Sequence, residues 1–327
     1  MLIGEGYRTF PVLIYTQFIS EVGGNSAFAI MAIIIALAIF LIQKHIANRY
    51  SFSMNLLHPI EPKKTTKGKM AAIYATVYGI IFISVLPQIY LIYTSFLKTS
   101  GMVFVKGYSP NSYKLAFNRM GSAIFNTIRI PLIALVLVVL FTTFISYLAV
   151  RKRNLFTNLI DSLSMVPYIV PGTVLGIAFI SLVYLEVDFF MITGTAFILI
   201  MSLSARKLPY TIRSSVASLQ QIAPSIEEAA ESLGSSRLNI FAKITTPMML
   251  SDIISGAILS WVTLISELST SILLYNVKTR TMTVAIYTEV LRGNYGVAAA
   301  LSTILTVLTV GSLLLFMKIS KSNSITL

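Results

Sequence analysis

One carboxylate occurs in an apolar run of the chain, ISELSTSILLY at residues 265–275, where Glu267 is the acidic residue. Four hydroxyl side chains accompany it: Ser266, Ser269, Thr270 and Ser271. If the run crosses a membrane, an ionised carboxylate there is costly, and it is expected to face the bundle interior or a water-filled path. The carboxylate and hydroxyl oxygens could line a translocation path; equally, they could be hydrogen-bonding partners that hold helices together.

Prolines and glycines mark a second irregular place, the sequence PYIVPGTVLG at residues 167–176. Pro167 and Pro171, followed by Gly172, predict a kinked or locally unwound span. The backbone groups freed by such a break are tolerated in a membrane only against protein or a cavity. We therefore add Pro167 and Pro171 to the candidate path formed by Glu267, Ser266, Ser269 and Thr270.

A polar segment, EEAAESLGSSRLNIFAKITTP at residues 227–247, interrupts the apolar chain. Ser225 and Glu228 fit a capping box for a short helix. Its apolar face carries four side chains at helical spacing: Ile226, Ala229, Ala230 and Leu233. Gly234 stands where a left-handed C′ residue is expected, and Ser236 can cap a second helix. Pro247 then begins the next apolar segment.

The first of these short helices could rest on lipid or dock into a protein. Interfacial helices usually carry Lys and Arg on the polar face. This one instead carries Glu227, Glu228 and Glu231. An acidic helix with small residues therefore indicates docking into a basic protein groove.

The composition places these segments in a membrane protein. Of the 327 residues, 56% are hydrophobic and 11% are charged, against about 25% charged in soluble domains. We expect an all-α, polytopic fold, because open sheet edges are not tolerated in lipid. The net charge of +13 is explained by basic loops on one membrane face, so no nucleic-acid partner is expected.

Seven spans are expected, and the positive charges orient them. The predicted spans are 26–42, 70–97, 124–150, 159–185, 190–205, 250–274 and 298–317. The loops 43–69, 151–158 and 206–249, with the tail 318–327, hold 16 of the 25 Lys and Arg residues. The opposite set holds eight. The richer set is cytoplasmic by the positive-inside rule, which puts the C-terminus in the cytoplasm.

Catalytic motifs are missing from the sequence. It contains no phosphate-binding G-x-x-x-x-G-K-[ST], no H-E-x-x-H, no G-x-S-x-G and no cysteine. His45 and His58 lie in or beside a basic loop. We expect no catalytic, cofactor or metal site in this chain, and a membrane-bound enzyme is disfavoured.

The polar segment resembles the EAA loop of ABC importer permeases, E-A-A-x3-G-x9-I-x-L-P. The matching residues are Glu228, Ala229, Ala230, Gly234, Ile244 and Pro247, and Thr246 replaces the usual Leu. Asn126-Thr127, Tyr147-Leu148-Ala149 before Arg151, and Pro167 to Gly172 also resemble the family, over roughly residues 70–320.

The resemblance implies partners. The EAA loop would be a coupling helix seated in a separate ATPase subunit, which acts as a dimer and uses ATP and Mg²⁺. An extracytoplasmic substrate-binding protein would deliver cargo to a multi-pass permease in the bacterial inner membrane, surrounded by lipid. ISELSTSILLY resembles ferric-iron permeases, which favours ferric iron or another small ion; polyamine, phosphonate and thiamine remain alternatives. An ion-coupled secondary transporter is the alternative of another class, but it needs an ionisable relay, and Glu267 is nearly alone.

An internal repeat suggests a boundary between two permease halves. RTFPVLIYTQF at 8–18 resembles RTMTVAIYTEV at 280–290, and an apolar span ending in Lys follows each copy. We predict that 1–43 is the tail of a preceding half, 44–69 a basic cytoplasmic linker, and 70–327 a six-span permease domain with the coupling loop 206–249. The chain then resembles the C-terminal part of a fused two-half ferric-iron permease and needs a second half; homodimerisation is the alternative.

Overall fold

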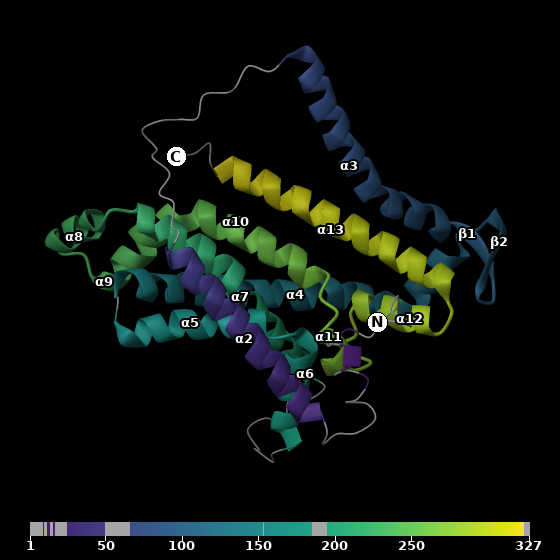
Figure 1. Cartoon of the computed structure of the whole chain (residues 1–327), viewed down its shortest axis with the longest axis horizontal. Helices are drawn as coiled ribbons and strands as arrows, with labels where there is room; N and C mark the ends of the chain where they lie inside the picture. The colour runs from purple at the N-terminus through teal and green to yellow at the C-terminus, as the bar shows by residue number, and fades with distance from the viewer. Residues whose placement is uncertain are drawn as a thin grey trace. The chain divides into compact units, whose positions relative to one another are not determined.

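Most of the described residues are helical. The computed structural model describes residues 9, 12–13, 16, 25–49, 66–152, 154–184 and 195–323 (Figure 1). Most of the repeat copy at 8–18, and residues 50–65 of the expected linker, therefore lie outside the described residues. The longer helices are α2 (Asn25–Arg49), α3 (Lys67–Ser95), α4 (Asn111–Arg151), α5 (Leu155–Ile169), α6 (Gly172–Tyr184), α7 (Ala196–Gln221), α10 (Thr246–Ile265), α12 (Met282–Leu291) and α13 (Tyr295–Asn323).

Shorter elements connect these helices, and the chain falls into two compact units. The short elements are β1 (Leu97–Ser100), β2 (Val103–Tyr108), α8 (Pro224–Ser232), α9 (Arg237–Ile240), the π-helical turn η2 (Phe241–Thr245) and α11 (Ser271–Leu274). The first unit comprises Met1–Leu37, Met120–Ala285 and Leu305–Leu327, and the second Ala38–Arg119 and Ile286–Ile304. Met120 has non-helical backbone angles (φ −124°, ψ 16°) and marks the boundary inside α4. The expected domain limits stay predictions.

Four helices of the described chain are long and apolar enough to cross a membrane, or five if the bent pair α5–α6 is one span. The four helices correspond to the expected spans 70–97, 124–150, 250–274 and 298–317, and the bent pair corresponds to the expected span 159–185. The bend between Ile169 and Gly172 is 104°, which confirms the predicted break. Of the two remaining expected spans, α2 covers 26–42 with a shorter apolar stretch, Ile30–Gln43. Part of 190–205 lies outside the described residues.

The core of the first unit lies where α4, α7 and α10 pack together. Ile130, Leu199 and Leu264 are each at most 2% exposed. Trp261 is buried in the same cluster, as expected of a packing residue, and its indole N–H donates to Ser312 Oγ at 2.7 Å. Gly256 allows α10 to approach α7 closely, because a Cβ there would lie 2.9 Å from Thr211 Cα.

Helix α7 corrects one sequence prediction. The predicted span ends at residue 205, and the predicted cytoplasmic loop begins at 206. The helix instead continues to Gln221. Thr211 and Ser260 join α7 to α10 by a hydroxyl–hydroxyl bond of 3.0 Å, and Lys207 is buried. Tertiary partners for these polar side chains allow the helix to continue.

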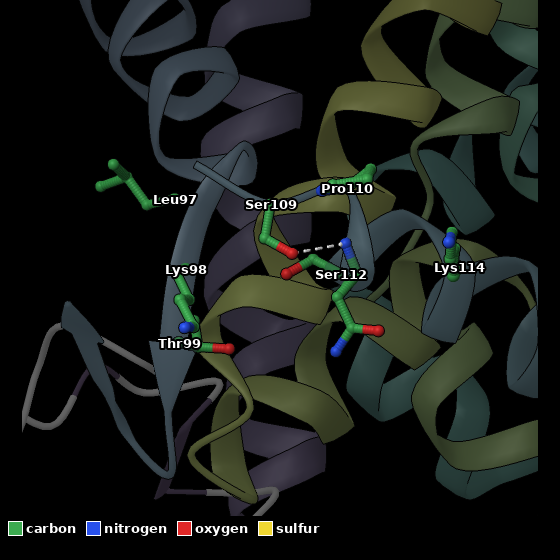
Figure 2. A pocket seen from close by; sticks show the side chains of 8 residues that line it. Leu97, Lys98, Thr99, Ser109, Pro110, Ser112 and Lys114 are labelled. Carbon is green, nitrogen blue, oxygen red and sulfur yellow. Dashed lines mark hydrogen bonds between the residues drawn. The ribbon is translucent and has the colours of Figure 1, made fainter. Parts of the chain in front are cut away.

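The second unit contains a β-hairpin that the sequence did not predict. Strands β1 and β2 pair antiparallel, from Leu97 at the end of the predicted span 70–97 into the expected outer loop 98–123. Gly101 and Gly107 have φ of +60° and +115°, which favour glycine in the turn and strand. A pocket of about 300 Å³ lies between β1 and the start of α4 and includes Lys98 and Lys114 (Figure 2). No residue singled out by the sequence lines it.

Candidate functional site

The polar segment folds into α8 and α9, and we refer to residues 224–240 as the α8–α9 segment. It begins at Pro224, one residue before the expected capping box. Ala223 is the N-cap of α8 and Pro224 is its first helical residue, a position that proline favours because its missing N–H needs no helical partner. The prediction that Ser225 caps the helix is therefore wrong. Glu227 and Glu228 still stand in the first turns, where the helix dipole stabilises negative charge.

Gly234 ends α8 as the spacing predicted. Its φ is +86°, which confirms the left-handed C′ position. The N–H of Gly234 donates to Glu231 O at 2.9 Å, and the N–H of Ser235 donates to Ala230 O at 3.0 Å. These two bonds form a Schellman motif and satisfy the last carbonyl groups of the helix.

A second short helix leads into the next span. Ser236 Oγ accepts from the N–H of Asn239 at 3.4 Å and caps α9, as predicted. The π-helical turn η2 follows, with Ile244 partly buried in it. Pro247 stands in the first turn of α10, as expected for the start of the next apolar segment. Turns of the π type inside helices frequently occur at functional sites.

The α8–α9 segment exposes apolar side chains at one end of the first unit. Helices α8 and α9 lie beyond the ends of α4, α5 and α10 there (Figure 1). Leu233 is 89% exposed and Leu238 is 80% exposed, and no residue of α8 is buried. Beside α8 lies a pocket of about 260 Å³ that includes Glu228, Arg237 and Ile240. These two leucines are accessible to a partner protein.

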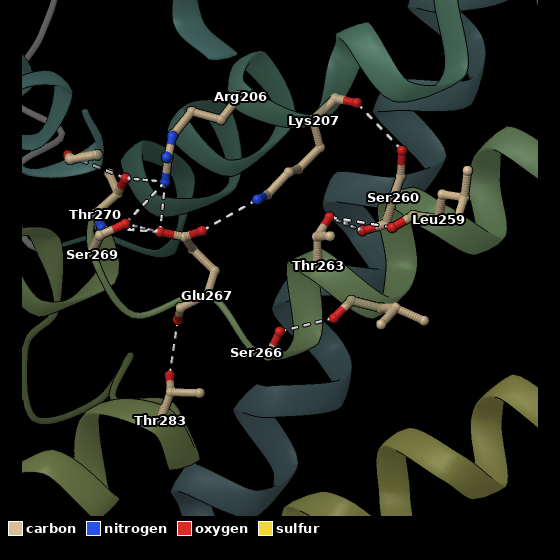
Figure 3. Close-up of polar contacts among 12 residues, drawn as sticks. Arg206, Lys207, Leu259, Ser260, Thr263, Ser266, Glu267, Ser269, Thr270 and Thr283 are labelled. Atoms are coloured by element: carbon tan, nitrogen blue, oxygen red, sulfur yellow. Dashed lines mark hydrogen bonds and ion pairs between the residues drawn. The ribbon is translucent and has the colours of Figure 1, made fainter. Parts of the chain in front are cut away.

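Glu267 lies in a compact ion cluster with two basic residues of α7 (Figure 3). Its Oε1 is 2.6 Å from Arg206 Nη1, and its Oε2 is 3.3 Å from Lys207 Nζ. The side chains are 8%, 13% and 9% exposed in the order Glu267, Arg206, Lys207. The hypothesis that Glu267 is nearly alone is therefore wrong.

Two candidate path hydroxyls belong to this cluster. Glu267 Oε1 accepts from Ser269 Oγ at 2.6 Å and from the N–H of Thr270 at 3.2 Å. Arg206 Nη1 donates to both hydroxyl oxygens, at 3.2 Å for Ser269 and 3.0 Å for Thr270. The carboxylate is thus satisfied by groups of its own chain.

The cluster joins two breaks in the helical structure. Helix α10 ends at Ile265, so Glu267 and its neighbours lie in a non-helical stretch and not on the helix that the sequence predicted. Thr270 Oγ1 donates to Gly172 O at 3.2 Å, at the break between α5 and α6. A Cβ on Gly172 would lie closer than 3 Å to Ser269 Oγ and Arg206 Nη1, so a side chain there would displace these two polar groups.

The remaining candidate path residues lie apart from these contacts. Ser266 is exposed, and its hydroxyl donates to Val262 O at 2.9 Å. Pro171 precedes Gly172 at the break, whereas Pro167 stands inside α5. Of the predicted set, the structure brings together Glu267, Ser269 and Thr270.

Arg206 and Lys207 are the residues that the sequence reasoning missed. A usable signal was present, because apolar residues continue at helical spacing beyond them: Leu208, Ile212, Val216 and Leu219. Ile212 and Leu219 are fully buried. Within the described part of the chain, no group of three or more His, Cys, Asp and Glu residues could hold a metal ion.

The residues that carried the family resemblance in α4 also have defined contacts. Asn126 Nδ2 donates to Lys278 O at 2.7 Å and to Arg280 O at 3.1 Å. Thr127 Oγ1 accepts from the N–H of Met282 at 2.7 Å, the first residue of α12. The pair therefore fixes the approach to α12.

Comparison with known proteins identifies one family over much of this architecture. Residues 142–321 match the family described as "Binding-protein-dependent transport system inner membrane component". The ferric transport system permease protein FbpB of Actinobacillus pleuropneumoniae is 34% identical over 224 residues, 68% of this chain and 31% of the relative. The Fe(3+)-transport system permease protein FbpB 2 of Haemophilus influenzae is 25% identical over 89% of this chain and 56% of the relative.

More distant relatives are named for cargo other than ferric iron. The sulfate transport system permease protein CysT of Salmonella typhimurium is 26% identical over 54% of this chain and 67% of its own length. Among solved structures, a bacterial ABC transporter involved in alginate import matches 78% of this chain and 96% of its own, with a TM-score of 0.61 and 17% identity. That likeness concerns the fold alone.

Proposed function

Because the chain belongs to the binding-protein-dependent transport system inner membrane components, we propose that it is a permease segment of an ATP-driven importer for ferric iron or another small ion. The observation that carries the proposal is the α8–Gly234–α9 segment, with its left-handed glycine and exposed Leu233 and Leu238. The ferric-transport relatives support the cargo class. The sulfate-transport relative is the reason that the proposed cargo class includes other small ions.

The proposed coupling residues are those of the EAA pattern. Glu228, Ala229, Ala230, Gly234, Ile244 and Pro247 place α8 against a separate ATPase dimer that binds ATP and Mg²⁺. In the same proposal a substrate-binding protein delivers cargo from outside, and the C-terminus is cytoplasmic in the bacterial inner membrane. The test is affinity purification of the tagged chain from its membrane. We expect an ABC ATPase to co-purify, and its absence from an intact complex would contradict the proposal.

For the candidate path residues we propose the second of the two roles that the sequence left open, that of hydrogen-bonding partners which hold helices together. Glu267, Ser269 and Thr270 hold the breaks in α5–α6 and α10–α11 together beside the path. The Glu267 carboxylate is paired with Arg206 and Lys207 of its own chain, so it does not bind a cationic cargo. An ion-coupled transporter would have to break this cluster in each cycle to use Glu267 as a relay.

The partner permease is a further proposal. The chain spans 31% and 56% of the lengths of the two ferric-transport relatives. With the repeat at 8–18 and 280–290, this supports a functional complex that contains another permease segment of about five or more spans, upstream or fused. The alternative is a homodimer.

Reconstitution distinguishes these assemblies. We expect liposomes containing this chain, the ATPase and the binding protein to show no transport until the second permease segment is added, because a path needs two facing bundles. Copy number by mass measurement of the complex is the second readout. Full transport by two copies of this chain, with no other membrane subunit, would favour the homodimer.

A further inference from the structure

Glu227 differs from the other acidic residues of α8 in its surroundings. Its side chain is 15% exposed, whereas that of Glu231 is 52% exposed and Glu228 is exposed as well. Its Oε1 accepts from Arg151 Nε at 3.1 Å and from Thr245 Oγ1 at 2.9 Å. Tyr147 OH lies 3.4 Å from Oε2. Both carboxylate oxygens are therefore turned toward the membrane bundle.

These partners come from different elements. Tyr147 and Arg151 stand at the end of α4, and Thr245 is the last residue of the π-helical turn that leads into α10. Arg151 Nη2 also donates to Ile222 O at 2.9 Å, just after α7. The Tyr147 ring contacts the Phe241 ring of η2 edge-on, with centroids 4.8 Å apart. One carboxylate thus connects α8 to the end of α4 and to the turn before α10, and Arg151 extends the connection to Ile222.

Helix α8 has few other attachments. It has no buried residue, so apolar packing contributes little to its position. Glu231 contacts Arg237 of α9 in an exposed ion pair, and such pairs contribute about 0–1 kcal/mol. The side-chain hydrogen bonds and ion pairs that join α8 to α4 and η2 all use Glu227.

We propose that Glu227 is a positioning residue that makes α8 move together with the ends of α4 and α10. The inference rests on the proposed function, in which α8 is the helix that docks to the ATPase. A displacement of α8 then reaches α10 through Thr245 and η2, and reaches α4 through Arg151. The docking residues and the transmitting residue are thus different: exposed Leu233 and Ala229 contact the ATPase, and Glu227 contacts the permease.

The first test removes the charge of Glu227 and then exchanges the charges of the Glu227–Arg151 pair. The measured quantity is uptake per ATP hydrolysed in proteoliposomes. Glu227→Gln keeps the shape of the side chain and removes its charge. We expect ATPase co-purification and ATP hydrolysis to persist while uptake per ATP falls about tenfold, within the usual range of coupling between sites. The double variant Glu227→Arg/Arg151→Glu should recover part of the loss. Glu231→Gln, the same change on the exposed pair, is the matched control. Any loss there should appear as weaker ATPase co-purification, and uptake per ATP of the assembled complex should stay as in the unaltered chain.

A covalent link replaces the ion pair in the second test. The chain contains no cysteine, so Arg151→Cys/Glu227→Cys can be joined selectively by a short bismaleimide. We expect the joined protein to transport more per ATP than the same variant left unjoined. Normal coupling in Glu227→Gln, loss of ATPase binding, failure to assemble, or no gain on joining would each overturn the positioning role. Absence of the ATPase from the unaltered complex would instead contradict the proposed function.

Discussion

Replacing Glu267 with Gln is expected to destabilise the permease rather than to change its cargo. The substitution leaves Arg206 and Lys207 buried without their carboxylate, at 2.6 and 3.3 Å from its former oxygens. Breaking a buried ion pair on one side costs about 3–5 kcal/mol. The measurement is the thermal midpoint of the purified complex, with the yield of assembled complex as a second readout.

Two further variants make the Glu267 test specific. Ser266→Ala, beside the cluster but outside it, should leave assembly and thermal stability unchanged. The triple variant Arg206→Met/Lys207→Met/Glu267→Gln removes all three charges and should recover most of the lost stability, because apolar replacement of a whole buried ion cluster is often neutral. If Glu267→Gln changes uptake while assembly and the thermal midpoint stay as they were, Glu267 lines the path instead.

Gly234→Val is expected to uncouple transport from ATP hydrolysis while the chain still inserts into the membrane. The φ of +86° costs a side chain about 1–2 kcal/mol. No heavy atom lies within 4 Å of the position a Cβ would take, so the cost comes from the backbone alone. We expect the turn between α8 and α9 to change and uptake to fall about tenfold. Uptake and ATP hydrolysis are measured together in proteoliposomes with the partner subunits.

Gly234→Asn is the matched control, because asparagine adopts left-handed backbone angles more readily than valine. It should retain most of the uptake. Glu228→Arg, which reverses a charge on exposed α8 without straining the turn, should uncouple transport in the same way as Gly234→Val. Normal uptake by both Gly234→Val and Glu228→Arg would remove the coupling-helix hypothesis.

Local sequence predicted the structure of the α8–α9 segment well, because that structure depends on neighbouring residues. The left-handed Gly234, the Ser236 cap and Pro247 at the start of α10 each follow from contacts within a few residues. The Ser225 cap was wrong for an equally local reason, since Pro224 begins the helix and the N-cap lies two residues earlier, at Ala223. Composition likewise sufficed for the helical membrane class, because the lack of water in a bilayer leaves few ways to satisfy the backbone.

Tertiary structure alone decided the roles of the charged residues. Arg206 and Lys207 look like the start of a cytoplasmic loop in sequence, and Glu267 lies 61 residues beyond Arg206. Likewise Glu227 reaches Arg151, 76 residues earlier in the chain. The sequence determined that these ionisable groups exist in an apolar chain. Whether a buried charge is a free ligand or one member of an ion pair depends on packing between distant helices, which hydrophobic periodicity does not encode.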